Sequence, residues 1–174
     1  MTKRPSGMTT SGKRAPGRQF RHNDGGRAAA GYRGSARDSV ARAIAIAAQR
    51  PYAEVYAALA AGVGAQRQRK TDGARRPASA RNGVNVRQTW FRNYMQTLGF
   101  HWTATMSIGS GTTTHLRADE LPPGRLVVAV SRHYTAVIDG VIHDTNDPSR
   151  NGSRAVYGYW SFQPTHERTL PRST

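Results

Sequence analysis

The sequence has no cysteine and few acidic residues, and both shortages limit what the chain can do. The absence of cysteine from its 174 residues excludes disulfide bonds and metal sites built on thiolates. Only 10 aspartate and glutamate residues stand against 26 lysine and arginine residues, which gives a formal net charge of +16. This excess of positive charge favours anionic partners such as nucleic acid, and it carries no information about the fold.

Long apolar runs are missing as well. No stretch approaches the roughly 18 consecutive apolar residues of a membrane span, and the basic N-terminus lacks the apolar segment of a secretory signal. We therefore expect no membrane contact and a cytoplasmic location. Hydrophobic residues make up 37% of the chain, a low share that indicates some unpacked tail.

Composition divides the chain into a folded domain and two tails. Residues 1–30 are rich in Gly, Ser, Arg, Lys and Ala, and they predict a disordered basic arm. Residues 31–163 hold almost all of the large apolar side chains and predict a single domain. Residues 164–174 read as a polar C-terminal tail.

Two basic segments are candidates for contact with nucleic acid. Residues 65–82 lack large apolar side chains and predict a mobile surface loop inside the domain. Nucleic acid could bind residues 1–27 and 65–81, although such charge is most often only solvated. Phe20 and Tyr32 are the aromatic residues near the arm, so base stacking has little support.

The first half of the domain carries helical periodicity. Apolar residues at spacings of three and four predict a helix over 39–49 and another over 86–98. Between them, Pro51 opens a helix at a position where its missing N–H costs nothing. The glycines of Gly62–Gly64 are expected to end that helix.

The second half of the domain has the pattern of strands. Short apolar or alternating runs predict strands over 125–130, 133–138, 141–144 and 155–162. The Asp139-Gly140 pair between two of them is a strong signal for a tight hairpin. Helices followed by an antiparallel sheet predict an α+β fold, with the N-terminal helices packed on the C-terminal sheet.

The hairpin can present an imidazole beside a carboxylate. Its register sets Asp144 about opposite Thr135, on the face that carries His133, whereas His143 points the other way. A carboxylate there could accept the imidazole N–H and fix its tautomer. Asp147 is a fallback for this acid. Asp144, Asp147 and His143 lack regular ligand spacing, so we expect no metal site.

Ser39 is the candidate nucleophile for this pair. It stands at the start of an apolar helix, where free backbone N–H groups favour negative charge. Each residue also has an ordinary structural explanation: Ser39 as a helix cap, His133 as an exposed polar residue, and Asp144 in a turn. Their combination and order are what favour a nucleophilic triad.

Three segments together resemble papain-like cysteine peptidases. They read Asp38-Ser39-Val-x-Arg-Ala-Ile-Ala-Ile-Ala, Pro51-Tyr-x-x-Val-Tyr and His133-Tyr-x-x-Val-Ile-Asp-Gly-x-Ile-x-Asp144. More narrowly, the chain is similar over about residues 31–162 to small bacterial and phage proteins whose first motif reads Asp-Cys-Val. The resemblance implies a papain-like fold, no cofactor, a bacterial or phage-infected cell, and hydrolysis of a peptide or isopeptide bond in a peptide or protein substrate.

The resemblance assigns catalysis to the residue at position 39, His133 and Asp144. The family's oxyanion glutamine has no clear counterpart, and Arg33 occupies its approximate place. Contacts to the oxyanion or substrate are therefore expected from backbone N–H groups and from a few nearby side chains. These are Arg33, Asp38, Tyr134 and Trp160.

Serine at position 39 departs from the family's cysteine. It is an engineered replacement, the mark of a naturally inactive relative, or a working serine nucleophile; a site built for a thiolate would lose most of its rate with oxygen there. We expect a hydrolase scaffold in an inactive form. The alternative is a basic protein associated with nucleic acid that uses the same scaffold without catalysis.

Overall fold

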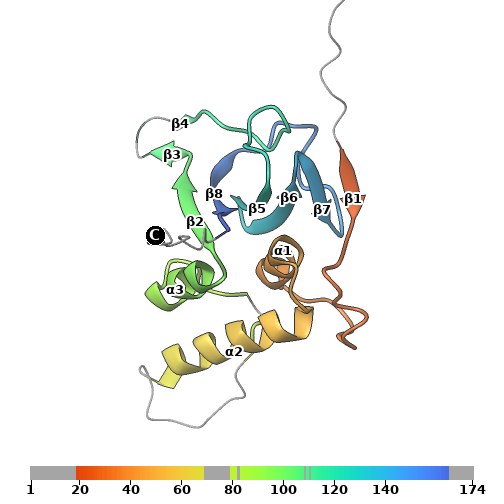
Figure 1. Ribbon diagram of the computed structural model, residues 1–174, viewed down its shortest axis with the longest axis vertical. Coiled ribbons are helices and arrows are strands. Elements are labelled where there is room, and N and C mark those ends of the chain that lie inside the picture. The colour runs from red at the N-terminus through yellow and green to blue at the C-terminus, as the bar shows by residue number, and fades with distance from the viewer. Residues whose placement is uncertain (1–18, 69–78, 82, 108, 110, 165–174) are drawn as a thin grey trace, which may run out of the picture.

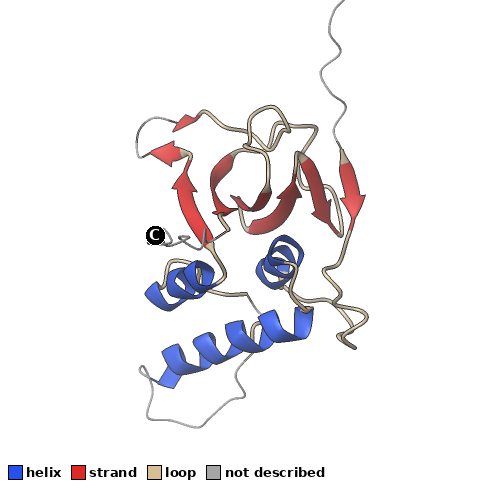
Figure 2. Cartoon of the chain, in the orientation of Figure 1, coloured by secondary structure: helices blue, strands red, loops and turns tan. Residues whose placement is uncertain are grey.

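The structure is a computed structural model that describes residues 19–68, 79–81, 83–107, 109 and 111–164. In this part of the chain, helices lie together on one side of a mixed sheet (Figures 1 and 2). The sheet has the strand order β1-β7-β6-β5-β8-β2. The helices are α1 (Ser39–Ala48), α2 (Tyr52–Gln68) and α3 (Thr89–Thr97). The sheet strands are β1 (Phe20–His22), β2 (Phe100–Ala104), β5 (Arg125–Val130), β6 (His133–Ile138), β7 (Val141–Asp144) and β8 (Val156–Phe162), and β3 (Met106–Ser107) pairs separately with β4 (Gly111–Thr112). The α+β class expected from the sequence is confirmed.

Helix α1 packs against both the sheet and helix α2. Its small alanines and its apolar isoleucines allow the helix to pack closely on the sheet. Ile44 and Ala47 are fully buried. Complete burial of a side chain such as Ile44 stabilises the fold by about 1.5–3 kcal/mol. The helix ends at Gln49, whose left-handed φ of 56° turns the chain toward α2. Packing against β5, β6 and β7 thereby fixes where the first turn of α1 lies.

The β6–β7 hairpin has the predicted register. Ile138 pairs with Val141 and Ala136 pairs with His143 across the turn. Asp139 and Gly140 both have positive φ, 47° and 80°, as a two-residue turn of the favoured hand requires. This register brings the start of β6 and the end of β7 to the same end of the hairpin.

Both faces of the sheet are buried at its central strands. Val127, Ala136 and Trp160 face the helices and belong to the larger core cluster. Val128 and Val137 face the opposite way, where the segment that precedes β5 covers them. A sheet covered on both sides explains why β5 is almost continuously apolar.

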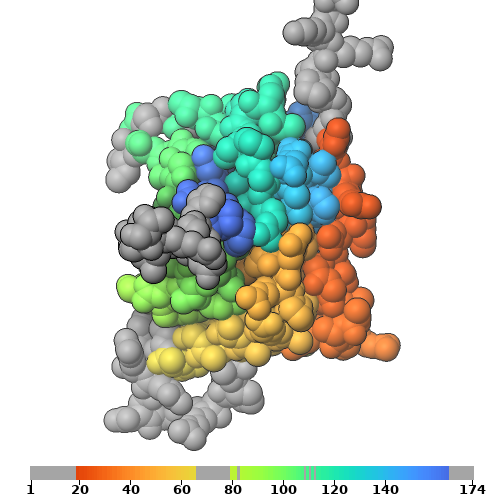
Figure 3. All heavy atoms as spheres, in the orientation of Figure 1, coloured from red at the N-terminus to blue at the C-terminus, as the bar shows by residue number. Residues whose placement is uncertain are grey.

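The expected arm over residues 1–30 is wrong for its second half. Phe20–His22 forms β1 and pairs in parallel with Ile142–Asp144 of β7. The ladder extends further, because the Asn23 N–H donates to the Asp144 carbonyl at 2.9 Å. Figure 3 shows this segment, coloured red to orange, as a strip along one flank of the molecule. Residues 1–18 lie outside the described part.

The expected end of the second helix is also wrong. Helix α2 runs through Gly62–Gly64 to Gln68, so the predicted loop at 65–82 begins later. Of that loop, residues 79–81 are described, and Ser79 Oγ lies 3.0 Å from the Tyr56 hydroxyl. Residues 69–78 and 82, like most of the predicted C-terminal tail, lie outside the described residues.

Among the described residues, no helix combines the length and the apolarity that are needed to cross a membrane.

Substitution of Gly62 by alanine tests the close contact between α2 and the Trp90 ring. In an exposed helix this change stabilises by up to about 1 kcal/mol, because glycine is a poor helix former. Here an added Cβ would overlap the Trp90 ring. We expect Gly62→Ala to lower the free energy of unfolding by about 1–3 kcal/mol in urea denaturation.

The control is the reverse change at the exposed neighbouring position, Ala61→Gly. It measures helix propensity alone and should cost about 1 kcal/mol. A Gly62→Ala protein as stable as the parent would show that the Trp90 contact does not explain the glycine.

Candidate functional site

The first part of the candidate site is a close histidine–aspartate pair. His133 Nε2 lies 2.6 Å from Asp144 Oδ2, across the open end of the β6–β7 hairpin. The Asp144 side chain is 4% exposed and that of His133 is 27% exposed. A carboxylate can only accept, so Nε2 carries the hydrogen and donates it. In the neutral ring, Nδ1 is then the nitrogen with a free lone pair.

The Asp144 carboxylate is held from several sides. Its backbone pairs with β1, and its Oδ1 accepts a hydrogen bond of 2.7 Å from the Thr145 N–H. Burial acts to raise the pKa of Asp144, but the hydrogen bonds and charge from His133 and the Thr145 N–H outweigh it. The pKa therefore lies below the ordinary value of 3.8, and the group is an anion at neutral pH.

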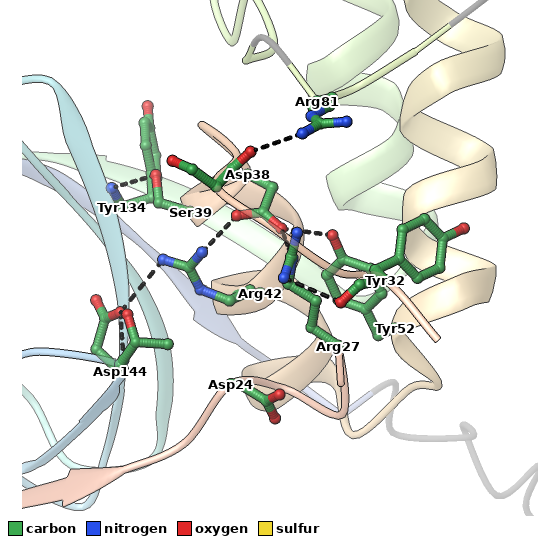
Figure 4. A network of polar contacts seen from close by, with 12 residues as sticks. Asp24, Arg27, Tyr32, Asp38, Ser39, Arg42, Tyr52, Arg81, Tyr134 and Asp144 are labelled. Carbon is green, nitrogen blue, oxygen red and sulfur yellow. Dashed lines mark hydrogen bonds and ion pairs between the residues drawn. The ribbon is translucent and has the colours of Figure 1, made fainter. Parts of the chain in front are cut away.

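Ser39 lies against the start of β6. It is the first residue of α1, and its Oγ accepts a hydrogen bond of 3.3 Å from the Tyr134 N–H (Figure 4). Tyr134 directly follows His133 in the chain. The three residues singled out from the sequence therefore come from three elements to one end of the sheet, Ser39 beside the strand and His133 bonded to Asp144.

The N-terminus of α1 is not capped by the side chain that precedes it. Asp38 occupies the N-cap position but makes no side-chain cap hydrogen bond. The first backbone bond of the helix runs from the Arg42 N–H to the Asp38 carbonyl at 3.1 Å. The N–H groups of the first turn thus contribute the positive end of the helix dipole beside Ser39.

Asp38, expected from the sequence to contact the oxyanion or substrate, has partners inside the fold. Its carboxylate is buried, with 2% of the residue exposed. It accepts hydrogen bonds from Arg27 Nε at 2.7 Å and from the Tyr52 hydroxyl at 2.6 Å, and it forms an ion pair with Arg42. Arg27 in turn donates to the Gly34 carbonyl at 2.9 Å, which fastens the loop before α1.

Trp160, also expected near the site, packs in the core of the domain. It is 4% exposed, and its ring packs 5.3 Å from that of Trp102 and 6.0 Å from that of Phe91. Strand β5 lies between β8 and β6, so this ring is two strands away from the strand of His133. Aromatic rings of this size contribute a large share of the buried apolar area of such a core.

Tyr134 and Arg33 are the remaining residues proposed from the sequence. The Tyr134 ring is half-buried, and burial raises its pKa to about 12, so its hydroxyl stays neutral at physiological pH. Its backbone N–H, rather than its ring, makes the contact with Ser39. Arg33 is exposed in the loop before α1, where its carbonyl accepts from Arg27 at 3.3 Å.

His143 and Asp147 have separate surroundings. His143 Nδ1 lies 3.4 Å from the Asn23 amide nitrogen, and Asp147 accepts a hydrogen bond of 2.9 Å from the Ser149 N–H. Over the described ranges, no three metal-ligating side chains gather closely enough to hold an ion.

Sequence reasoning missed Arg42. Its guanidinium lies between Asp38 and Asp144, with one nitrogen paired to Asp38 and Nη2 at 3.5 Å from Asp144 Oδ1 (Figure 4). Two signals were present: an arginine inside an otherwise apolar helix, and its spacing of four residues from an aspartate. The second carboxylate could not be read from either signal, because it is contributed by a distant strand.

Comparisons with known proteins give no relative for this chain. It matches no protein-family model, no curated protein and no solved structure. The functional argument therefore depends on the geometry described above.

The Asp144–His133 pair should be visible in the acid stability of the protein. The pKa of Asp144 is depressed in the folded state, so its contribution is present above the unfolded value near 3.8 and is lost as the pH falls through the folded value. We expect Asp144→Asn to lower the free energy of unfolding at pH ~7 by about 1–3 kcal/mol. Its stability should also depend less on pH below about 4.

Urea denaturation at pH ~7 and across this acidic range measures both effects. The control is Asp119→Asn, which removes an exposed carboxylate from an ion pair with Arg117 and should change stability by less than about 1 kcal/mol. Equal losses in the two variants would contradict a special contribution from Asp144.

Proposed function

We propose that this chain is a papain-like hydrolase scaffold for peptide or isopeptide bonds, with serine at the position of the thiol nucleophile. One observation carries the proposal: a histidine bonded to a buried carboxylate at 2.6 Å, at the strand end against which the first residue of a helix packs. A nucleophile at a helix N-terminus, opposite an imidazole and its acid on a sheet, is a coherent arrangement for acyl transfer.

The free lone pair on His133 Nδ1 can act as the general base in acyl transfer. As residue 39 attacks the carbonyl carbon, its proton passes to His133 Nδ1, and the carbonyl electron pair moves to oxygen. The first-turn N–H groups of α1 are the donors that we expect for that oxyanion. Collapse of the intermediate breaks the C–N bond, and the imidazolium returns the proton to the leaving amine. Water then repeats the sequence on the acyl group, with Asp144 holding the ring throughout.

Whether residue 39 carries sulfur or oxygen decides the rate of hydrolysis. A thiol with a pKa near ~8.5 is readily ionised beside an imidazole, whereas a serine hydroxyl must lose its proton during attack. The Tyr134 N–H that bonds Ser39 Oγ would also donate to a thiolate, as would the helix end. We therefore propose that the serine form is weakly active or inactive and that a thiol restores the nucleophile.

Ser39→Cys provides a direct test, because the parent chain has no cysteine and any labelling reports on one site. We expect iodoacetamide to alkylate the introduced thiol with an apparent pKa about 1–3 units below 8.5. Adding His133→Gln should return that value toward 8.5. The measurement is the alkylation rate by mass spectrometry over a series of pH values.

A thiol introduced by Ser35→Cys serves as the matched control. Ser35 is exposed in the loop four residues before Ser39, so its thiol should titrate as an ordinary cysteine with or without His133. The hydrolase proposal fails if the position-39 thiol behaves like this control.

Contact with nucleic acid through the basic segments is a second proposal, favoured by the net charge of +16. Deletion of residues 1–18 tests it without removing β1 or Arg27. The deletion removes the positive charges of Lys3, Arg4, Lys13, Arg14 and Arg18. We expect weaker binding to single-stranded DNA and a shallower dependence on salt, measured by fluorescence anisotropy. Unchanged affinity and salt dependence would exclude this segment as the contact.

A further inference from the structure

The feature that the triad leaves unexplained is a guanidinium shared by two buried carboxylates. Arg42 belongs to α1, and its side chain is 12% exposed. One of its terminal nitrogens pairs with Asp38 Oδ1, and the other lies 3.5 Å from Asp144 Oδ1. Figure 4 shows the guanidinium between the two acids, on the side of α1 that faces the end of β7.

Neutralisation of Asp38 does not by itself require Arg42. The Asp38 carboxylate already receives Arg27 at 2.7 Å and the Tyr52 hydroxyl at 2.6 Å. Burial of an additional guanidinium is costly unless it gains further partners. Arg42 also retains a buried Nε without a hydrogen-bond partner in the described structure. The contact that distinguishes Arg42 from Arg27 is the one with Asp144.

The two oxygens of Asp144 have different partners. Oδ1 faces Arg42 and accepts from the Thr145 N–H at 2.7 Å, whereas Oδ2 accepts from His133 at 2.6 Å. Rotation of the carboxylate would break both sets of contacts at once. A cation fixed on α1 therefore holds Oδ1 and leaves Oδ2 directed at the imidazole.

We propose that Arg42 is a positioning residue that sets the orientation and charge of Asp144 for His133. The proposal rests on the hydrolase function proposed above. The guanidinium completes a row of alternating charges, Arg27, Asp38, Arg42 and Asp144, that leads from the N-terminal segment to the imidazole. Because Arg42 and Ser39 are on the same helix, the row also fixes the acid relative to the nucleophile position.

Arg42→Gln and Arg42→Lys test this role, with Arg27→Gln and Arg27→Lys as matched controls. Both arginines pair with Asp38, but Arg42 is the one of the two that reaches Asp144. A lysine ammonium cannot span two carboxylates as the guanidinium fork does, and it should remain with Asp38. Arg42→Lys therefore keeps the buried charge pair, and it is the variant to use if Arg42→Gln does not fold.

The first measurement uses the Ser39→Cys protein. We expect either Arg42 variant to raise the apparent pKa of the introduced thiol by about one unit, which lowers its alkylation rate below that pKa roughly tenfold. The Arg27 variants should leave that pKa within about 0.3 units. Equal shifts from Arg27→Lys and Arg42→Lys would overturn the proposal, because support of Asp38 would then explain both.

The second measurement does not depend on the hydrolase function. In the Ser39 protein, the Asp144 carboxyl is titrated by ¹³C NMR, with circular dichroism to confirm folding. Both Arg42 variants should raise the pKa of Asp144, and the Arg27 variants should not. An unchanged Asp144 pKa in folded Arg42→Lys overturns the positioning role, whatever the thiol does. A raised Asp144 pKa in the Arg42 variants, together with a thiol of ordinary pKa in the Ser39→Cys protein, retains the contact and rejects the hydrolase.

Discussion

A buried negative charge at the start of α1 is the constraint on which the arrangement depends. Asp38 cannot be left alone in a low-dielectric interior, and loss of one partner of such a group typically costs about 3–5 kcal/mol. Its partners come from three places: Arg27 from the N-terminal segment, Arg42 from α1 and Tyr52 from α2. Because all three partners must reach this carboxylate, the contacts hold the loop before α1, the first turn of α1 and the start of α2 in place together.

The candidate site inherits its geometry from that constraint. Ser39 directly follows Asp38, so the anchored carboxylate limits where the first turn of α1 can lie. Apolar packing of the same helix against β5 and β6 limits its rotation, and the Tyr134 N–H meets the serine oxygen. Asp144 is held by β1 on its backbone and by Thr145 and Arg42 on its carboxylate, and Arg42 links it to Asp38. Helix α1 and the β6–β7 hairpin thus present their polar groups to each other.

Local signals predicted the sheet hairpin well, and non-local contacts account for what was missed. The alternation on β6 and β7 and the Asp139-Gly140 turn determine the register within a short stretch, which is why the approach of His133 to Asp144 could be derived. Strand β1 has three exposed residues, and its parallel partner lies more than 100 positions away, so no local pattern reveals it. Helix α2 continues past Gly62, where the Trp90 ring packs against the glycine, and this tertiary contact is invisible to local helix propensity.

The parallel pairing of β1 also covers the edge of the sheet at β7. Without it, β7 would be an edge strand, with its N–H and C=O groups available to a second chain. Strand β1 instead forms the boundary, and it is short, exposed and carries Arg21 and His22, features that discourage strand addition. A shortened protein that begins at residue 31 would uncover the β7 edge. Self-association through that edge would then compete with the folded state and would engage the backbone that carries Asp144.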